Sequence, residues 1–293
     1  MDFGGGGMLQ IKAVFPSLEG FETTRDTLHW YSKAIGVISR AHAEIQPRWQ
    51  HLGLIVRPNG FETVKMPLPG GGKFSLRMDL TRHRTVLVNS SGTTQELDML
   101  AGFTAVQFGE QLIQMVKNLG LKGKYDRKRF EDNGTRFYDP EMAERFLAVL
   151  NQINRIFNRH RESLEGDRDP VLLWPHGFDL GFVWFGSRPV TYEENGKIVQ
   201  GLAQLNLGFS PGESSYPKPY FYSNPWPFEK DKLVNQPLPE DASWHLESWK
   251  GSLLPYNRLV NKERAEELLL EYARAVYKIA APTLNVGGSN HLR

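Results

Sequence analysis

Two pairs of histidine and aspartate are the residues in this chain that could carry acid–base chemistry. His176 and Asp179 lie three residues apart in an aromatic-rich run at residues 174–184. A carboxylate among apolar rings has a raised pKa or needs a partner, because desolvation disfavours its charge. A nearby imidazole can be that partner, and such a pair can perform general acid–base catalysis. The simpler alternative is that Asp179 accepts hydrogen bonds from backbone amides in a turn, while His176 is a buried polar group whose hydrogen bonds are satisfied.

Asp79 and His83 form the second candidate pair, at a turn that follows a strand-like segment. His51 is a further candidate acid or base, with Asp79 or Asp179 as the group that orients it. The eight histidines show no spacing typical of a helical metal-binding pair, and no H-E-x-x-H or H-x-H motif occurs. We therefore predict no metal site, while a site assembled across strands stays open.

Other classes of chemistry lack the residues that they need. The chain has no cysteine, which excludes disulfides, thiol catalysis and iron–sulfur clusters. No G-x-S-x-G motif, phosphate loop or dinucleotide fingerprint is present, so no cofactor is predicted. Lys and Arg total 35 against 33 Asp and Glu, and the basic run at residues 122–129 is followed by acidic residues, which predicts no nucleic-acid partner. No apolar run of membrane-spanning length and no signal-peptide pattern is found, which predicts a soluble, cytoplasmic protein.

Aromatic residues are concentrated in one part of the chain. Residues 174–228 contain 13 of them, about twice the number that the overall 12% would give, and seven prolines crowd into residues 211–239. A stiff, aromatic segment that lies on a sheet is typical of the wall or lid of a ligand pocket. We predict ligand-binding residues from this segment and from His29: Trp174, Trp184, Tyr220, Tyr222 and Trp226. The alternative is a long surface crossover that its rings pin to the core.

The elements that must position these residues occur in an order that is repeated. Each half begins with a helical pattern, continues with alternating strand patterns and ends with another helix. We therefore predict an α+β fold of two similar halves, each an antiparallel sheet flanked by helices, which indicates an internal duplication. The expected divisions are a lead-in at residues 1–22, a first half at 23–121, a linker at 122–138, a second half at 139–281 with a Pro/aromatic-rich insertion at about 210–256, and a tail at 282–293.

The periodicities place the individual elements. Helices are expected at residues 24–44, at 103–119, from Pro140 onward and at 261–280. Capping is expected from Thr23 with Asp26 for the first helix and from Asp139 for the third, and Pro282 is expected to end the last one. The expected strands are 52–56, 63–68, 74–80, 85–89, 93–98, 171–174, 178–185, 198–209 and 219–223, with a hairpin turn at Asn195 and Gly196.

Four segments of the chain also resemble an uncharacterised bacterial family, the domain of unknown function DUF5996. They are Phe15-Pro-Ser-Leu18, Thr27-Leu-His29, Phe178-Asp-Leu180, and Tyr220-Phe-Tyr222 with Trp226-Pro227. The resemblance extends from about Phe15 to Ala280. It implies a soluble bacterial protein and brings no activity, cofactor or catalytic residue with it. It draws attention to the matching positions His29, His51, His83 and Asp179.

These observations predict a protein that binds a small molecule in an aromatic-lined cleft between the halves. An enzyme that uses a His/Asp pair in the same cleft is one form of this prediction. The alternative is a non-catalytic interaction module that docks a protein partner through residues 210–228. We expect His51 or His176 within hydrogen-bond reach of Asp79 or Asp179, since an approximate twofold would bring equivalent positions together. The sequence leaves the ligand, the reaction and the oligomeric state open.

Overall fold

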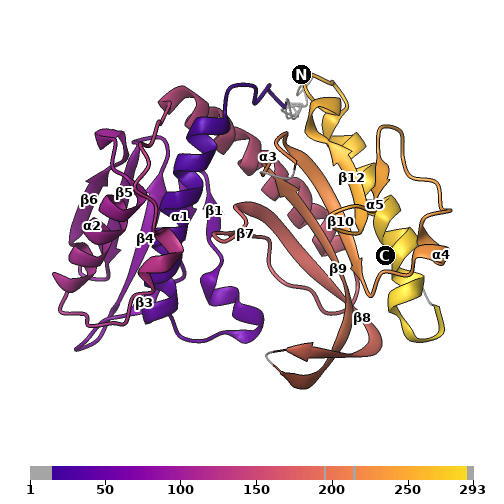
Figure 1. Cartoon of the computed structure of the whole chain (residues 1–293), viewed down its shortest axis with the longest axis horizontal. Helices are drawn as coiled ribbons and strands as arrows, with labels where there is room; N and C mark the ends of the chain where they lie inside the picture. Colours follow the sequence, from indigo (N-terminus) through magenta and orange to yellow (C-terminus); the bar gives the residue numbers. More distant parts are fainter. Residues whose placement is uncertain (1–14, 195, 214–215, 289–293) are drawn as a thin grey trace, which may run out of the picture.

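The computed structural model describes residues 15–194, 196–213 and 216–288, and it shows two six-stranded antiparallel sheets with helices packed on them (Figure 1). This arrangement confirms the predicted α+β class with two halves. The α-helices are α1 (Glu22–His42), α2 (Ala105–Lys117), α3 (Pro140–Ser163), α4 (Lys230–Leu233) and α5 (Ala265–Leu284). The 3₁₀ turns are η1 (Pro47–Leu52), η2 (Met99–Ala101), η3 (Arg127–Phe130), η4 (Tyr256–Arg258) and η5 (Val286–Gly288). None of the described helices is long and apolar enough to span a bilayer.

The first sheet is a meander in the order β1-β2-β4-β5-β6, with the short β3 paired to β4. Its strands are β1 (Ile55–Arg57), β2 (Gly60–Glu62), β3 (Met66–Pro67), β4 (Lys73–Asp79), β5 (Arg84–Asn89) and β6 (Thr94–Asp98). Helices α1 and α2 pack on each other, and the buried stripe of α2 contacts β6. The alternation of apolar residues in β4 places Phe74, Leu76 and Met78 in the core, as strand geometry requires.

The second sheet has the order β11-β12-β10-β9-β8-β7. Its strands are β7 (Leu172–Trp174), β8 (Asp179–Glu194), β9 (Lys197–Ser210), β10 (Tyr220–Trp226), β11 (Ser243–His245) and β12 (Gly251–Pro255). Strands β7 to β10 form a meander like that of the first sheet, whereas β11 and β12 are exchanged in order at the far edge. Residues 210–256, which the sequence marks as an insertion, thus supply three strands of this sheet. The expected turn residue Asn195 lies outside the described residues.

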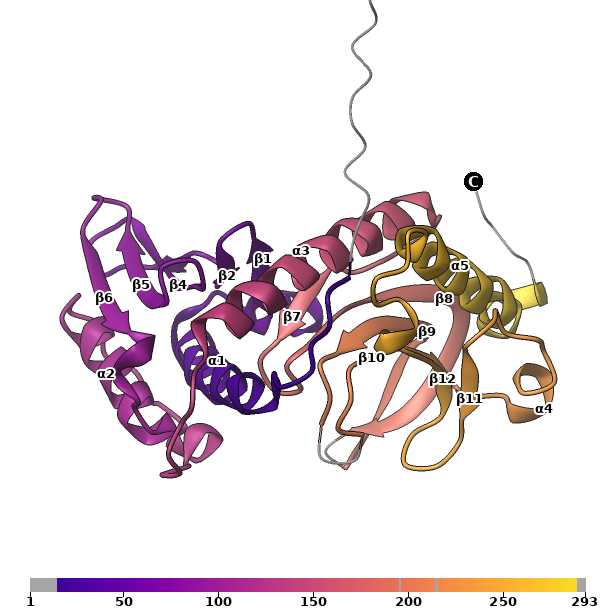
Figure 2. The same ribbon diagram turned by 90° about the horizontal axis from the view of Figure 1, so that it is seen from above.

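The two sheets meet edge to edge. Just before β1, Leu54 exchanges two backbone hydrogen bonds with Leu173 of β7, at 2.8 and 2.9 Å. Helix α3 runs past this junction and contacts β1 in one half and β8 and α5 in the other (Figure 2). The halves are therefore joined by backbone pairing and by one long shared helix.

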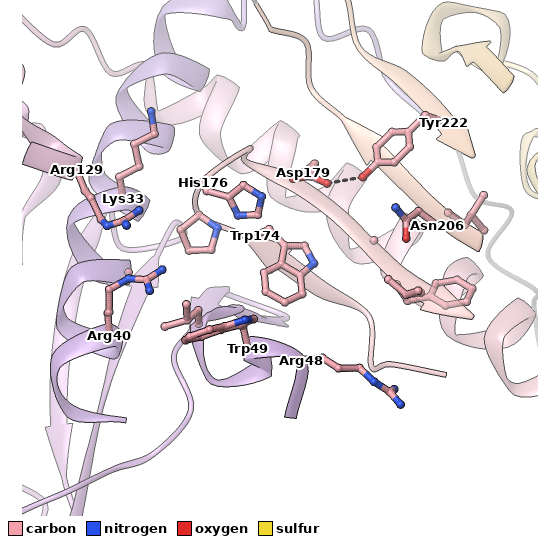
Figure 3. A pocket seen from close by; sticks show the side chains of 17 residues that line it. Lys33, Arg40, Arg48, Trp49, Arg129, Trp174, His176, Asp179, Asn206 and Tyr222 are labelled. Carbon is pink, nitrogen blue, oxygen red and sulfur yellow. Dashed lines mark hydrogen bonds between the residues drawn. The ribbon is translucent and has the colours of Figure 1, made fainter. Parts of the chain in front are cut away.

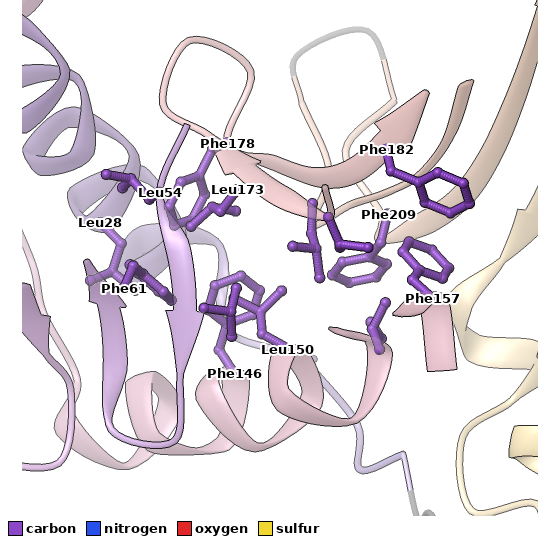
Figure 4. Close-up of a cluster of buried hydrophobic side chains, with 14 of the residues drawn as sticks. Leu28, Leu54, Phe61, Phe146, Leu150, Phe157, Leu173, Phe178, Phe182 and Phe209 are labelled. Carbon is purple, nitrogen blue, oxygen red and sulfur yellow. The ribbon is translucent and has the colours of Figure 1, made fainter. Parts of the chain in front are cut away.

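The buried apolar side chains form one core that continues across the junction (Figure 4). Phe178 belongs to this core and is 1% exposed. Its ring packs on Phe61 of β2, Phe146 of α3 and His29 of α1, with centroid distances of 6.2, 5.7 and 5.5 Å. One phenylalanine thereby ties the start of β8 to three elements, two of them in the first half.

The start of α3 agrees with its prediction, and the start of α1 does not. Asp139 caps α3, accepting from the amides of Glu141 and Met142 at 2.9 and 3.2 Å, and Pro140 is the first helical residue, as predicted. The predicted cap at Thr23 is wrong, because α1 begins at Glu22 after Phe21, whose buried ring stacks on Phe146 at 4.4 Å. Tertiary packing of an aromatic residue sets this helix start, and no side-chain hydrogen bond caps it.

The last helix differs from its prediction at both ends. Asn261 has a left-handed φ of 55°, so it cannot begin a helix, and α5 starts at Ala265. Pro282 lies inside the last turn and does not end it. A proline removes one hydrogen bond there, but Ala281, Thr283 and Leu284 are all buried, so packing keeps the turn helical.

Candidate functional site

A cavity of about 720 Å³ lies between the two halves (Figure 3). The first half lines it with one face of α1 and with η1, and the linker adds Arg129 of η3. The second half lines it with the turn at residues 174–176 and with β8, β9 and β10. This volume is in the usual range for a small-molecule pocket.

Strand alternation places the polar groups of the second half on one face of the sheet. Leu180 and Phe182 of β8 point into the core, so Asp179, Gly181 and Val183 face the cavity. On β9, Asn206 faces the cavity in the same way. The core-facing residues alternate with these in sequence, which is why so polar a wall can be part of a well-packed sheet.

Tyr222 and Asp179 form a hydrogen-bonded pair in this wall, although they come from strands that are not adjacent. Gly208 of β9 pairs with both Tyr222 of β10 and Gly181 of β8. The phenol ring lies over Gly208, where a Cβ atom would overlap it. Because Gly208 has no side chain, the Tyr222 ring can lie across β9. Its hydroxyl donates a hydrogen bond to Oδ2 of Asp179.

Burial dominates the electrostatics of this pair. It raises the pKa of the Asp179 carboxyl above its usual value, and the charge of Glu213 acts in the same direction. The Tyr222 hydroxyl and the nearby His176 oppose this rise. The pKa of Tyr222 is held well above its ordinary value, mainly by burial and then by the Asp179 charge. The pair thus contains a carboxyl group that retains its proton to a higher pH than an exposed aspartate does.

His29 holds the turn that carries His176. Its ring stacks on Phe178, and its Nε2 lies 3.1 Å from the backbone oxygen of His176. Burial lowers the pKa of His29 to about 4, and Lys33 adds to this, so the ring is neutral near pH 7. Because a carbonyl oxygen can only accept, Nε2 carries the proton and donates. The His29 ring does not line the cavity, but its contacts with His176 and Phe178 hold the turn in place.

Helix α1 approaches the same turn closely because it has a glycine at the contact. A Cβ atom at Gly36 would lie 3.3 Å from Cβ of Pro175. Lys33 and Arg40, one turn away on either side, line the cavity from the same helix face. The glycine therefore allows two cations to reach a cavity that is formed largely by the other half.

The cations that line the cavity differ in how they are paired. Arg48 forms ion pairs with Asp167 and Asp169, and Arg129 pairs with Asp126 at 3.0 Å. Lys33 and Arg40 form no ion pair with any carboxylate in the part of the chain that the structure describes; the Lys33 ammonium lies 4.2 Å from the centre of the Trp30 ring. Burial lowers the pKa of both groups. No described carboxylate lies within ion-pairing distance of these two groups, although Asp26 and Asp132 attract the Lys33 ammonium and Asp126 attracts the Arg40 guanidinium at longer range.

Two tryptophans separate the charged side from the Asp179 side. Trp174 ends β7, and Trp49 lies on η1 with 57% of its surface exposed. Arg48 and Trp49 both have left-handed backbone angles, with φ values of 54° and 60°. Such strain persists where surrounding contacts hold it, and here Arg48 is held by its two carboxylates and by the face of Phe185 at 3.8 Å. The strained turn presents the indole of Trp49 to the cavity.

Four of the predicted site residues come together at the cavity, namely Trp174, His176, Asp179 and Tyr222. The other predicted ligand-binding residues lie elsewhere. Trp184 is buried and donates from its indole to the backbone oxygen of Glu165 at 2.7 Å. Tyr220 is 5% exposed and packs between Tyr216 and Trp249. Trp226 packs edge-on against Tyr192.

His51, Asp79 and His83 also lie away from the cavity and perform structural tasks. Nδ1 of His51 accepts from the backbone amide of Gln46 at 3.2 Å. Asp79 accepts from the side chain of Asn59 and from the amides of Thr81 and Arg82, so it organises the β4–β5 turn. Nδ1 of His83 lies 3.1 Å from the Tyr138 hydroxyl.

The expected convergence of two histidines on these aspartates does not occur. Within residues 15–194, neither His51 nor His176 forms a hydrogen bond with Asp79 or Asp179. The Asp79 carboxylate accepts hydrogen bonds from Asn59 and Thr81 and does not line the cavity. Only His176 is near one of the two, since its charge lowers the pKa of Asp179.

Sequence reasoning missed the cationic side and Asn206. Lys33, Gly36 and Arg40 share one helix face at spacings of three and four, and a glycine inside a helix is a signal of close approach. Asn206 is in step with Gly208 on a strand whose apolar partners are Leu205 and Leu207. By contrast, nothing local in the sequence indicates that Arg129 reaches the cavity.

No cluster of histidine and acidic side chains suitable for a metal ion occurs among the described residues. Comparison with protein families matches residues 15–289 to a family model described as "Family of unknown function (DUF5996)". The match spans every residue that lines the cavity. No curated protein and no solved structure matches the chain significantly.

Proposed function

The chain belongs to the family of unknown function DUF5996, and from that premise we propose that its cavity binds a small organic anion with a flat, apolar body. The observation that carries the proposal is that Lys33 and Arg40 line the cavity with two indole rings and have no carboxylate of the described residues within ion-pairing distance. Cations with no carboxylate partner, held next to an apolar surface, favour an acid group on an apolar ligand. Trp49 and Trp174 offer ring faces or edges to the body of such a ligand.

The burial of the segment at residues 210–228 supports this proposal over the docking of a protein partner. A docking face needs a contiguous exposed apolar patch. Tyr220 and Phe221 are buried, and Tyr222 faces the cavity. These three rings thus contribute to the sheet and to the pocket, while Tyr216, Trp226 and Phe228 of the same segment are half-buried.

Binding of 4-methylbenzoate, measured by saturation-transfer NMR, tests the proposal. We expect it to bind about tenfold more tightly than neutral 4-methylbenzamide, because only the acid can pair with Lys33 and Arg40. The double variant Lys33→Met/Arg40→Met is expected to remove this preference. The variant Lys65→Met/Lys117→Met removes the same net charge from exposed sites away from the cavity and serves as the control. Equal affinities for the acid and the amide in the wild type would overturn the proposal.

Proton transfer by Asp179 is a second candidate function, in line with the predicted acid–base role. It is favoured by one observation, a carboxyl group that burial holds at a raised pKa and that opens on a ligand-sized cavity. His51 and Asp79 have no part in this version. The phenol of Tyr222 and the imidazole of His176 are the groups that tune the carboxyl.

The titration of Asp179 tests this second candidate. Its carboxyl ¹³C resonance, identified by its loss in Asp179→Asn, is expected to titrate above the ordinary value of 3.8. Tyr222→Phe removes a hydrogen bond that stabilises the carboxylate, so the midpoint is expected to move further upward. A midpoint at or below 3.8 in the wild type would rule out Asp179 as a carboxyl group whose pKa burial raises.

A further inference from the structure

Apart from His176 and from Arg48, whose charge Asp167 and Asp169 offset, the polar groups of the cavity are separated by the sign of their charge. Figure 3 shows Lys33, Arg40 and Arg129 together on the side of the first half, and Asp179, Tyr222 and Asn206 on the side of the second. The two tryptophans lie between these groups. A simple anion site would need only the first of these sides, so the second side calls for its own explanation.

The second side is rich in hydrogen-bond acceptors. Oδ1 of Asn206 is buried and has no hydrogen-bond partner among the described residues. A buried carbonyl oxygen without a donor is destabilising, so a donor from a ligand would be stabilising here. Asp179 adds a carboxyl group whose described side-chain donor is the Tyr222 hydroxyl.

The electrostatic field on this side favours a cation. Glu213 is close enough to raise the pKa of both Asp179 and Tyr220, so a second carboxylate contributes negative potential. The face of an indole ring also attracts cations, and Trp174 borders this side. His176 and Arg48 are the basic side chains that line the cavity and lie against the second half, and Asp167 and Asp169 offset the charge of Arg48.

We propose that the natural ligand of this pocket is a zwitterion, with an acid group at Lys33 and Arg40, a flat apolar spacer at the tryptophans, and a protonated amine at Asp179 and Asn206. This inference rests on the proposed function, since it adds a second recognition group to the same anion. A protonated amine has N–H donors for both the Asn206 oxygen and the Asp179 carboxylate. Its charge also offsets the negative charge that burial makes costly at Asp179.

Matched probes that differ only at the far end test the inference. They are 4-methylbenzoate and 4-(aminomethyl)benzoate, with the corresponding 4′-substituted biphenyl-4-carboxylates as a longer pair, so that the length of the spacer does not decide the result. In the wild type, the amine is expected to improve the dissociation constant at least tenfold in one of the two pairs. Asp179→Asn is expected to reduce this gain, measured as the ratio of the two dissociation constants in the same variant, to about twofold or less. Asn206→Ala, which keeps all charges, is expected to reduce the gain in part.

The outcomes separate this inference from the proposed function. If the methyl acids bind and the amine gives no gain at either length, the zwitterion is excluded, and the anion site stands. If the amine gains affinity equally in the wild type and in Asp179→Asn, the assignment of its partner is wrong. If 4-methylbenzylamine, which has no acid group, binds as tightly as 4-(aminomethyl)benzoate, the anion site fails, while amine recognition remains.

Discussion

Lowering the pH from about 7.5 to about 5 is expected to reduce the free energy of unfolding by roughly 4 kcal/mol through two histidines. Burial lowers the pKa of both His29 and His160 to about 4, whereas a histidine in the unfolded chain has a pKa of 6.5. Between pH 6.5 and pH 4, the two histidines are therefore protonated in the unfolded state and largely neutral in the folded state. Stability is complete above that pH and is lost as the pH falls toward 4, by about 2 kcal/mol for each ring at pH 5.

Urea denaturation at both pH values measures this loss. His29→Gln and His160→Leu are each expected to reduce the pH-dependent loss by about half, and the double variant to remove most of it. His42 and His51, whose pKa values burial also lowers, act in the same direction. Asp179 acts in the opposite direction, because a raised carboxyl pKa adds stability as the pH falls. A loss that is unchanged in the double variant would show that neither ring is kept neutral by burial.

Phe178→Ala is expected to destabilise the protein by about 3–5 kcal/mol. The ring is almost completely buried and contacts Phe61, Phe146 and His29, so its removal leaves a cavity where the two halves meet. Elements from both halves surround the space, and they cannot all move inward to fill it. The backbone at this position has a left-handed φ of 56°, which is strained for any residue other than glycine. In the alanine variant this strain remains, while the packing of the ring that offsets it is lost.

The chain provides a matched control for this variant. Phe137 is 66% exposed, and Phe137→Ala is expected to change the free energy of unfolding by about 0.5 kcal/mol or less. Chemical denaturation of both variants, compared with Phe178→Leu, gives the measurement. Phe178→Leu keeps much of the buried volume and is expected to lie between the wild type and Phe178→Ala. A cost for Phe178→Ala close to that of Phe137→Ala would show that Phe178 does not anchor the core.

Periodicity in the sequence is enough to predict the fold class but not the edges of the sheets. Apolar spacing identifies α3 and β4, because both bury one continuous face. It misses β11 and β12, which are short strands after a proline-rich stretch. β12 pairs with β10, and β11 pairs with β12, so both depend on contacts with the rest of the sheet. It also misses the left-handed turn at Arg48 and Trp49, because long-range ion pairs hold that backbone and no turn residue does.

The candidate site shows the same limit at the level of single residues. A charged residue in an aromatic run points to Asp179, and the structure places this residue at the cavity. Asp79 has a similar local pattern, yet its carboxyl organises a turn, and only the tertiary structure distinguishes the two. Lys33 and Arg40 are 2 of 35 basic residues, so their lack of a partner can be recognised only once every neighbouring carboxylate has been placed.

The backbone pairing of Leu54 with Leu173 has a consequence for how the halves can exist. β1 and β7 are the terminal strands of their sheets, and an unpaired terminal strand is a template for association with other chains. Each half shields this edge of the other through two hydrogen bonds, and α3 covers the place where they meet. The pairing of the two halves thus covers a terminal strand of each sheet that would otherwise be open to association with other chains. Residues 23–121 made alone would present a bare strand edge to solvent, and the same is true of residues 139–281.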